Sequence, residues 1–230
     1  MRRISFVFLS VSIFLWLIFN FLCDNPAIET VYPLSFSDTV LVIDAGHGGE
    51  DGGAISLTGV SESHLNLAVS KRLDLVLGLF GVRTLPLREE DISLHDKSAQ
   101  TLRQKKNSDL HNRADTVNEQ ENAILLSIHQ NSYPDGRYSG SQAFYAPTEG
   151  SQELARIIQE ALRLALDPGN TRQEKQISDT IYLMNHISCP GVLVECGFLT
   201  NAREEQLLRS EVYQTKLAMA LAGGYLNAVT

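Results

Sequence analysis

LVIDAGHGGEDGGA, at residues 41–54, contains the features from which the rest of the chain can be interpreted. The run that leads into it, residues 40–43, is short, apolar and rich in β-branched residues, which is typical of a buried strand. The glycines that follow permit positive φ angles and let a ligand approach the backbone closely. The sequence therefore predicts a strand that ends in a sharp turn and presents His47 at its carboxyl end.

A glycine-rich turn after a strand also begins many nucleotide-binding loops. Here no Lys-Ser/Thr pair follows the glycines, and the G-x-G-x-x-G pattern is missing. The acidic side chains of Glu50 and Asp51 would repel a phosphate group. A metal ligand is the better interpretation of His47.

The composition describes an ordinary globular protein. Of the 230 residues, 43% are hydrophobic and 20% are charged, which is typical of one folded α/β domain. The formal net charge of −8 makes nucleic acid an improbable partner. The three cysteines, Cys23, Cys189 and Cys196, lack C-x-x-C spacing and form no disulfide framework, so we expect free thiols in the core.

The amino-terminal region has a different character. Arg2 and Arg3 precede an uncharged apolar run over residues 4–23, which is long enough to cross a bilayer. We interpret residues 1–23 as a signal anchor in the membrane, with a cleaved signal peptide as the alternative, and residues 24–38 as a tether. Because basic residues remain in the cytoplasm, either interpretation places residues 24–230 outside it, anchored or secreted.

The remaining sequence alternates between strand and helix patterns, which predicts a single α/β domain over residues 39–230. Its central sheet is expected to be mixed but mainly parallel, with helices on both faces. The stretch 88–106 is expected to be a loop with a turn or two of helix. Strands are expected at 40–43, 82–87, 123–129, 140–146, 181–184 and 192–194, and helices at 61–80, 108–119, 151–166, 204–208 and 212–227.

Four chemically capable residues lie at the ends of these elements. His47, His129 and Glu195 each close an apolar strand, and Glu62 opens the helix after the glycine turn. Open α/β sheets bind ligands beyond the carboxyl ends of their strands. Two imidazoles and one carboxylate suit a zinc site with an open position, which leaves Glu195 as a base.

Each of these residues has a simpler alternative role. Taken alone, Glu62 would complement the helix dipole. His64 is a rival ligand, although we expect it at the surface or facing substrate. Asp44 and Asp51 are expected to hold the loop by hydrogen bonds or to orient a ligating imidazole.

Together the motifs resemble those of the zinc-dependent N-acetylmuramoyl-L-alanine amidases of the amidase-3 type. The blocks DAGHGGEDGGA, SESHLNLAV with Glu62, SIHQNS and ECGFLTN occur here in the order of that family, and the resemblance covers about residues 40–227. It implies that His47, Glu62 and His129 bind one Zn²⁺ and that Glu195 is the catalytic glutamate. The implied substrate is peptidoglycan, cleaved at the amide between muramic acid and L-alanine.

Within this family the chain looks most similar to the short sporulation and germination amidases. It joins a membrane segment directly to the catalytic region and lacks wall-binding repeats. This similarity implies a role in forming muramic δ-lactam in the forespore or spore cortex, followed by a deacetylase in the same pathway. The short segment 93–113 leaves little room for an autoinhibitory helix, so another protein or access to substrate would regulate activity.

Two other functions stay open at this point. Another zinc hydrolase of the wall, a peptidase or a deacetylase, would share the metal chemistry and cut a different bond. A membrane-tethered binding module would need no Glu195, so its presence argues against that function. Asn131 and the amides of the glycine loop are candidate stabilisers of an oxyanion, and Arg113 is expected to form a salt bridge or to meet a carboxylate of the stem peptide.

Overall fold

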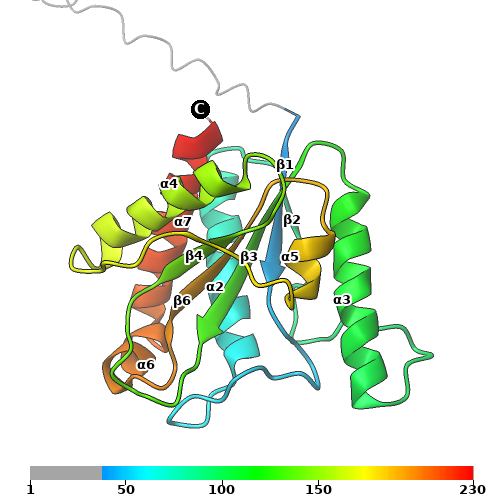
Figure 1. Cartoon of the computed structure of the whole chain (residues 1–230), viewed down its shortest axis with the longest axis horizontal. Coiled ribbons are helices and arrows are strands. Elements are labelled where there is room, and N and C mark those ends of the chain that lie inside the picture. Colours follow the sequence, from blue (N-terminus) through cyan, green and yellow to red (C-terminus); the bar gives the residue numbers. More distant parts are fainter. Residues whose placement is uncertain (1–37, 230) are drawn as a thin grey trace, which may run out of the picture. The chain divides into compact units, whose positions relative to one another are not determined.

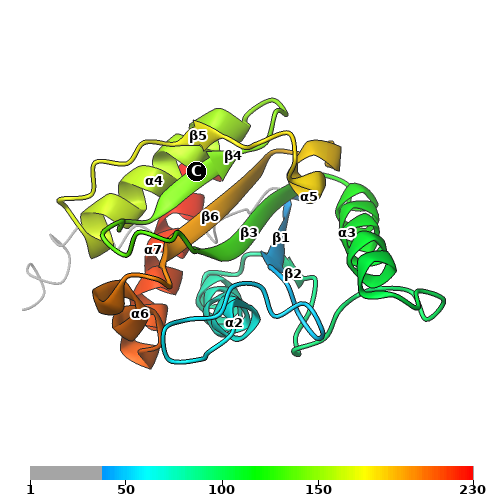
Figure 2. The ribbon, with the colours of Figure 1, turned by 60° about the horizontal axis from the view of Figure 1, so that its bottom comes forward.

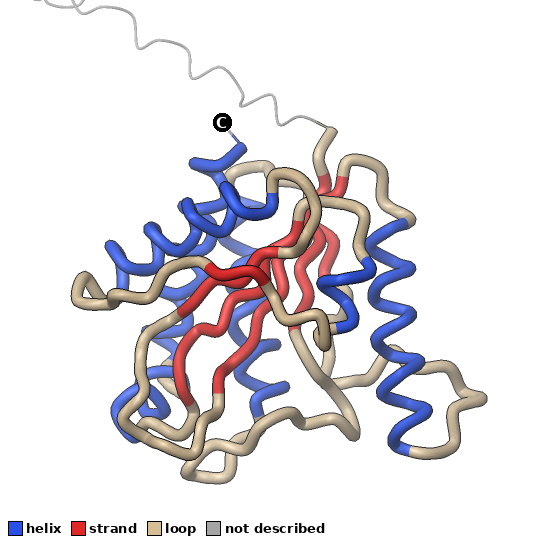
Figure 3. Tube along the Cα trace, in the orientation of Figure 1, coloured by secondary structure: helices blue, strands red, loops and turns tan. Residues whose placement is uncertain are grey.

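The computed structural model describes residues 38–229, which fold around one six-stranded sheet (Figure 3). The four strands at one side of this sheet are mutually parallel, the next runs antiparallel to them, and the edge strand is parallel to that one. The sheet is therefore mixed and mainly parallel, as predicted. Its order is β2 (Thr84–Pro86), β1 (Val40–Ala45), β3 (Ala123–Asn131), β6 (Gly191–Phe198), β4 (Gln142–Tyr145) and β5 (Lys175–Gln176).

Helices cover both faces of the sheet (Figures 1 and 2). On one face lie α2 (Glu62–Leu79), α4 (Ser151–Leu166) and α7 (Glu211–Val229), with the short α6 (Ala202–Leu208) before α7. On the other face lie α3 (Leu102–Asn118) and α5 (Tyr182–His186). None of the helices within residues 38–229 is long and apolar enough to span a membrane.

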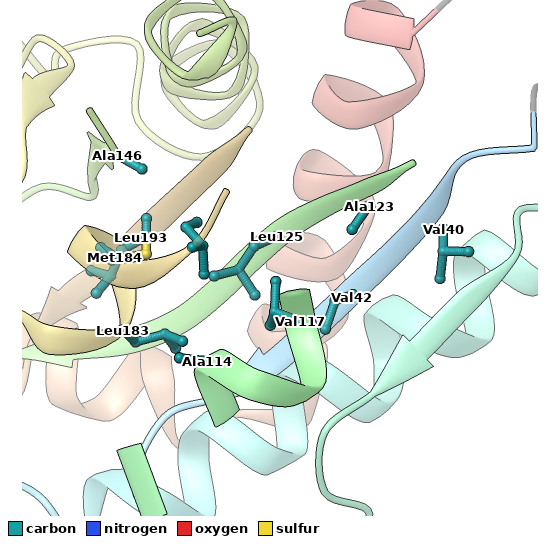
Figure 4. Packing of buried hydrophobic residues seen from close by; sticks show 11 residues of the cluster. Val40, Val42, Ala114, Val117, Ala123, Leu125, Ala146, Leu183, Met184 and Leu193 are labelled. Carbon is teal, nitrogen blue, oxygen red and sulfur yellow. The ribbon is translucent and has the colours of Figure 1, made fainter. Parts of the chain in front are cut away.

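Alternation along the strands distributes the apolar side chains between two cores. Val40 and Val42 of β1 pack with Val117 of α3 and Leu183 of α5 in the cluster drawn in Figure 4. Their neighbours along β1 point to the opposite face, because successive side chains of a strand alternate. All six residues of β1 are buried, as expected for a central parallel strand. The face toward α3 and α5 is the one from which the site described below opens.

Two secondary-structure predictions were wrong. The stretch 181–184 was expected to be a strand, but Ile181 is the N-cap of α5 and residues 182–184 are helical, since a short apolar run does not distinguish a strand from one buried helical turn. The helix α3 begins at Leu102 rather than at residue 108 because Thr101 and Gln104 form a capping box. The predicted membrane segment, residues 1–23, and most of the tether, residues 24–38, lie outside the described residues.

Candidate active site

The carboxyl ends of β1 and β3 and the first turn of α2 bring three predicted ligands together. Glu62 lies between the two imidazoles, with its Oε1 2.9 Å from His129 Nδ1 and its Oε2 3.4 Å from His47 Nε2. One ligand atom from each residue lies within 4.8 Å of the others. Ligand bonds of about 2.1 Å around a tetrahedral zinc separate the ligand atoms by about 3.4 Å. The donor set and its spacing therefore fit a zinc ion.

Two glycines make room for this group of side chains. A Cβ at Gly46 would lie 2.2 Å from His129 Nε2, and a Cβ at Gly53 would lie 2.6 Å from Glu62 Oε2. Gly53 also has a φ of +68°, which a residue with a side chain rarely adopts. Glycine is therefore required at these two positions of the first motif for a steric reason, because the side chains of the candidate ligands occupy the space that a Cβ atom would need.

We predict that Gly46→Ala lowers zinc affinity at least about tenfold, since the added methyl group displaces the His129 ring. Competition with a chelator of known affinity measures this loss. Gly78→Ala is the matched control, because a Cβ at Gly78 in α2 meets nothing within 4 Å. That variant should keep its zinc affinity and gain about 0.5–1 kcal/mol of stability. Equal zinc affinity of the two variants would contradict the steric argument.

Two buried arginines hold the backbone that presents His47. This residue has a φ of +63°, a conformation that costs about 1–3 kcal/mol unless its surroundings impose it. Arg113 Nη2 donates to the His47 carbonyl at 2.8 Å, and Arg88 Nη2 donates to the Gly46 carbonyl at 3.1 Å. The Ala45 carbonyl accepts from both guanidinium groups, from Arg88 Nε at 2.8 Å and from Arg113 Nη1 at 3.1 Å. The turn is therefore fixed from two sides.

Arg113 is anchored by carboxylates rather than free to meet a substrate. It forms a buried ion pair with Asp44 and a second one, at 2.7 Å, with Asp109. Ser127 donates to the other oxygen of Asp44 at 2.6 Å. The salt bridge foreseen for Arg113 is confirmed, whereas among residues 38–229 the Asp44 carboxylate bonds only Ser127 of β3 and Arg113 of α3 and so reaches the loop through Arg113.

Sequence reasoning missed Arg88, which begins the stretch expected to be a loop. It is 3% exposed and donates to backbone carbonyls of the glycine turn and of α2. The signal was available, because Arg88 follows the carboxyl end of β2, beside the strand that presents His47. The reasoning that selected the histidines would have selected it as well.

We predict that Arg113→Lys destabilises the fold by about 1–3 kcal/mol, because an ammonium group cannot reproduce the guanidinium hydrogen bonds to buried acceptors. Urea unfolding of the full-length chain measures this change. Arg156→Lys is the control, since Arg156 pairs with Glu153 on the exposed side of α4. That exchange should change stability by less than about 0.5 kcal/mol. Equal stability of both variants would show that the hydrogen bonds of Arg113 contribute little.

The carboxylates around the imidazoles favour positive charge at this position. Burial opposes a charge on His47, but hydrogen bonds with Asp51 and Glu62 raise the pKa of its imidazole to about 9. Burial would likewise raise the pKa of Glu62, yet its hydrogen bonds with His129 and His47 hold that pKa well below its usual range. Asp51 Oδ2 lies 3.0 Å from His47 Nδ1, and Asp51 Oδ1 accepts from the Gly53 amide at 3.3 Å, so Asp51 holds the loop by a hydrogen bond, as expected. A cation between these groups would be electrostatically favoured.

Glu195 lies opposite His129 in the pairing of β6 with β3. Its Oε2 is buried and has no hydrogen-bond partner among residues 38–229. Burial raises the pKa of the Glu195 carboxyl to about 7. A buried carboxyl group with a pKa near neutrality, next to candidate metal ligands, is suited to take up and release a proton.

A cavity of about 430 Å³ opens over these side chains. Leu110 of α3 and Ile181, which precedes α5, both line it, as does Asn131 beside the candidate ligands. His64 is not part of the cavity lining; it pairs with Asp91 at 2.9 Å and is exposed, as expected. The four predicted site residues thus share one cavity, whereas the oxyanion role of Asn131 stays a prediction.

Comparison with known proteins identifies the family. Residues 41–227 match the family model for N-acetylmuramoyl-L-alanine amidases. The chain belongs to this amidase family. It is 34% identical over 224 residues to the germination-specific N-acetylmuramoyl-L-alanine amidase of Bacillus subtilis, and the match covers 97% of this chain and 93% of that protein.

Solved structures of amidases share the fold. The chain is similar to the CwlD amidase from Clostridioides difficile, solved in complex with the GerS lipoprotein, with a TM-score of 0.79 and 38% identity over 82% of this chain and 97% of that one. A second amidase from Clostridium difficile 630 matches with a TM-score of 0.72 and 29% identity over 83% and 97% of the two chains. The chain is accordingly a hydrolase of the cell wall that acts on an amide bond of peptidoglycan.

Proposed function

We propose that this amidase is zinc-dependent, with His47, Glu62 and His129 as the ligands of one Zn²⁺ and Glu195 as the catalytic base. The observation that supports this most strongly is the grouping of the three ligand atoms within 4.8 Å, beside a buried carboxyl group. Zinc is preferred over other divalent ions because two imidazoles and one carboxylate are a common zinc ligand set.

The chain's own residues account for the proton transfers in this proposal. A zinc ion held by His47, Glu62 and His129 would lower the pKa of a water molecule and polarise a carbonyl group. Glu195 takes a proton from the attacking water on its free carboxylate oxygen. It then donates this proton to the nitrogen of L-alanine, because an amide anion leaves poorly. Asn131, in the cavity wall, is the candidate hydrogen-bond donor to the oxyanion.

Digestion of purified peptidoglycan tests the bond that is cut. The full-length chain is treated with a chelator, returned to buffer with or without zinc and incubated with the wall, and the released fragments are identified by mass spectrometry. Stem peptides with a free L-alanine amino group, released only with zinc, support the proposal. Cleavage within the stem peptide, or loss of acetyl groups from the wall, would favour another zinc hydrolase. If the protein binds peptidoglycan but releases no fragments, a binding module would be favoured.

We further propose that the enzyme acts outside the cytoplasm, held by residues 4–23, and prepares muramic acid for δ-lactam formation in spore cortex. The similarity to a germination-specific amidase supports this role. A deacetylase would act on the product, and the neighbour solved in complex with the GerS lipoprotein supports a lipoprotein as binding partner.

Complementation tests this role. The gene is expressed in a Bacillus subtilis strain that lacks its germination-specific amidase, and the muropeptides of the cortex are analysed. Recovery of muramic δ-lactam by the natural chain, and not by Glu195→Gln, is the expected result. Amidase activity in vitro without recovery of the lactam would contradict the cortex role alone.

A further inference from the structure

The register of the sheet places an aromatic side chain on the face from which the cavity opens. Residues directly opposite each other on neighbouring strands point to the same face. Glu195 lies opposite His129, and an irregularity in β6 then brings Phe198 opposite Asn131, two residues further along β3. Since Asn131 shares the face of His129, so does Phe198. Phe198 therefore lies on the same face of the sheet as the candidate metal site, further toward the carboxyl ends of the strands.

Two exposed tyrosines lie beside Phe198, which is itself only 4% exposed. The ring of Tyr138 lies 6.2 Å from that of Phe198, and the Tyr133 ring lies 4.8 Å from that of Tyr138, at an interplanar angle of 70°. Tyr133 is 50% exposed and Tyr138 is 47% exposed. The guanidinium group of Arg172 lies 4.8 Å above the centre of the Phe198 ring. We call these four residues the aromatic platform.

The loop that carries both tyrosines is tied to the rest of the domain. The side chain of Asn201 donates to the carbonyl of Gly136 at 2.9 Å and to that of Tyr138 at 3.2 Å. Thr200 Oγ1 accepts from the Tyr133 amide at 3.2 Å. Thr200 and Asn201 end the ECGFLTN block, so this part of the motif holds the loop rather than the metal. The exposure of the two rings is therefore a fixed feature of the surface.

We propose that the aromatic platform binds the glycan strand of peptidoglycan beside the muramic acid whose amide is cut. This inference rests on the proposed amidase function. The cavity would bind the amide that is cut, and the aromatic platform would bind the glycan strand of the same substrate. Tyrosine suits this ligand because its ring packs against the apolar face of a pyranose while its hydroxyl group reaches the sugar hydroxyls. Arg172 Nε and Nη1 already donate to the Ser139 carbonyl and to Gln142 Oε1, so Arg172 would offer its Nη2 to the acetamido and hydroxyl oxygens of the sugars.

The distance from the candidate metal site fits this arrangement. Tyr133 lies four positions after His129, which limits the separation of their Cα atoms to about 14 Å of extended chain. The scissile amide is joined to its sugar ring through the short lactyl group, so the first sugar lies close to the metal. The neighbouring rings of the same strand can then reach the tyrosines, whereas the peptide stem leaves from the other side of the amide.

The selectivity of the full-length enzyme for long substrates tests the platform. We compare kcat/KM on intact glycan strands that carry stem peptides with kcat/KM on one muramic acid joined to its peptide. For the double variant Tyr133→Ala, Tyr138→Ala, the ratio of the two values is expected to fall about tenfold. Phenylalanine at both positions should restore most of this ratio, because the rings remain. Leu164→Ala, an exposed apolar residue on the opposite side in α4, should leave it unchanged.

A binding measurement separates this inference from the amidase function. Peptide-free glycan strands cannot be hydrolysed at the amide, so their binding to the full-length chain needs no catalysis. We expect about tenfold weaker binding for the double alanine variant than for the natural chain. An unchanged ratio of kcat/KM together with unchanged glycan binding would overturn the platform and leave the amidase function intact. Glycan binding that depends on the tyrosines, without any release of peptide, would overturn the amidase proposal alone.

Discussion

Glu195→Gln is expected to reduce peptide release from peptidoglycan by at least about 10³-fold while zinc stays bound. Glutamine has nearly the shape of glutamate but cannot accept a proton from water or return one to the departing nitrogen. The side chain lies in the cavity and not among the three grouped ligand atoms, so the metal should be retained. Initial rates of stem-peptide release and the zinc content of the purified variant measure the two effects.

The choice of control follows from the position of Glu195. Glu160→Gln removes a carboxylate from the exposed side of α4, where it pairs with Arg163. That variant should keep both activity and zinc. The amide group that replaces the Glu195 carboxyl can also donate a hydrogen bond in the cavity, so a loss of stability is not expected to explain the lost activity. A Glu195→Gln enzyme that retains full activity would exclude Glu195 as the base.

The candidate site could be predicted from the sequence because it depends on one simple rule. Parallel strands end at the same edge, so His47 and His129, which close different apolar strands, had to lie near each other. Glu62 followed because a short turn leads from the first strand to the helix that it opens. The same rule placed Glu195, since β6 runs parallel to β3. Local patterns therefore sufficed for residues whose side chains meet at strand ends.

The surroundings of the site could not be predicted in the same way. The helix α3 has few buried apolar residues, so periodicity gave no sign of its first turns, and only the cap at Thr101 marks its beginning. The helix α5 is a single short element whose apolar residues fit a strand equally well. The position of Arg88 after a strand could have been noticed, but its partners could not, because the backbone carbonyl groups that it holds leave no trace in the sequence. The cavity walls, which decide how substrate fits, therefore needed the structure.

His129→Ala is expected to lower zinc affinity by at least about 10³-fold and to abolish activity with it. The change removes one of three protein ligands, and two ligands rarely hold zinc against competing buffer. It also removes the hydrogen bond from His129 Nδ1 to Glu62 Oε1, so a 4% exposed carboxylate loses a partner. Zinc content after dialysis and chelator competition measure the affinity.

Thermal unfolding gives a readout that does not depend on turnover. A ligand that binds only the folded state stabilises it by about 4.1 kcal/mol at a concentration 1,000 times its Kd. Zinc should therefore raise the Tm of the natural chain and of Glu195→Gln, and should leave the Tm of His129→Ala unchanged. His64→Ala, which removes an exposed histidine paired with Asp91, should respond like the natural chain. A Tm of His129→Ala that rises with zinc as in the natural chain would exclude His129 as a ligand. Loss of the shift in Glu195→Gln would instead make Glu195 a ligand rather than the base.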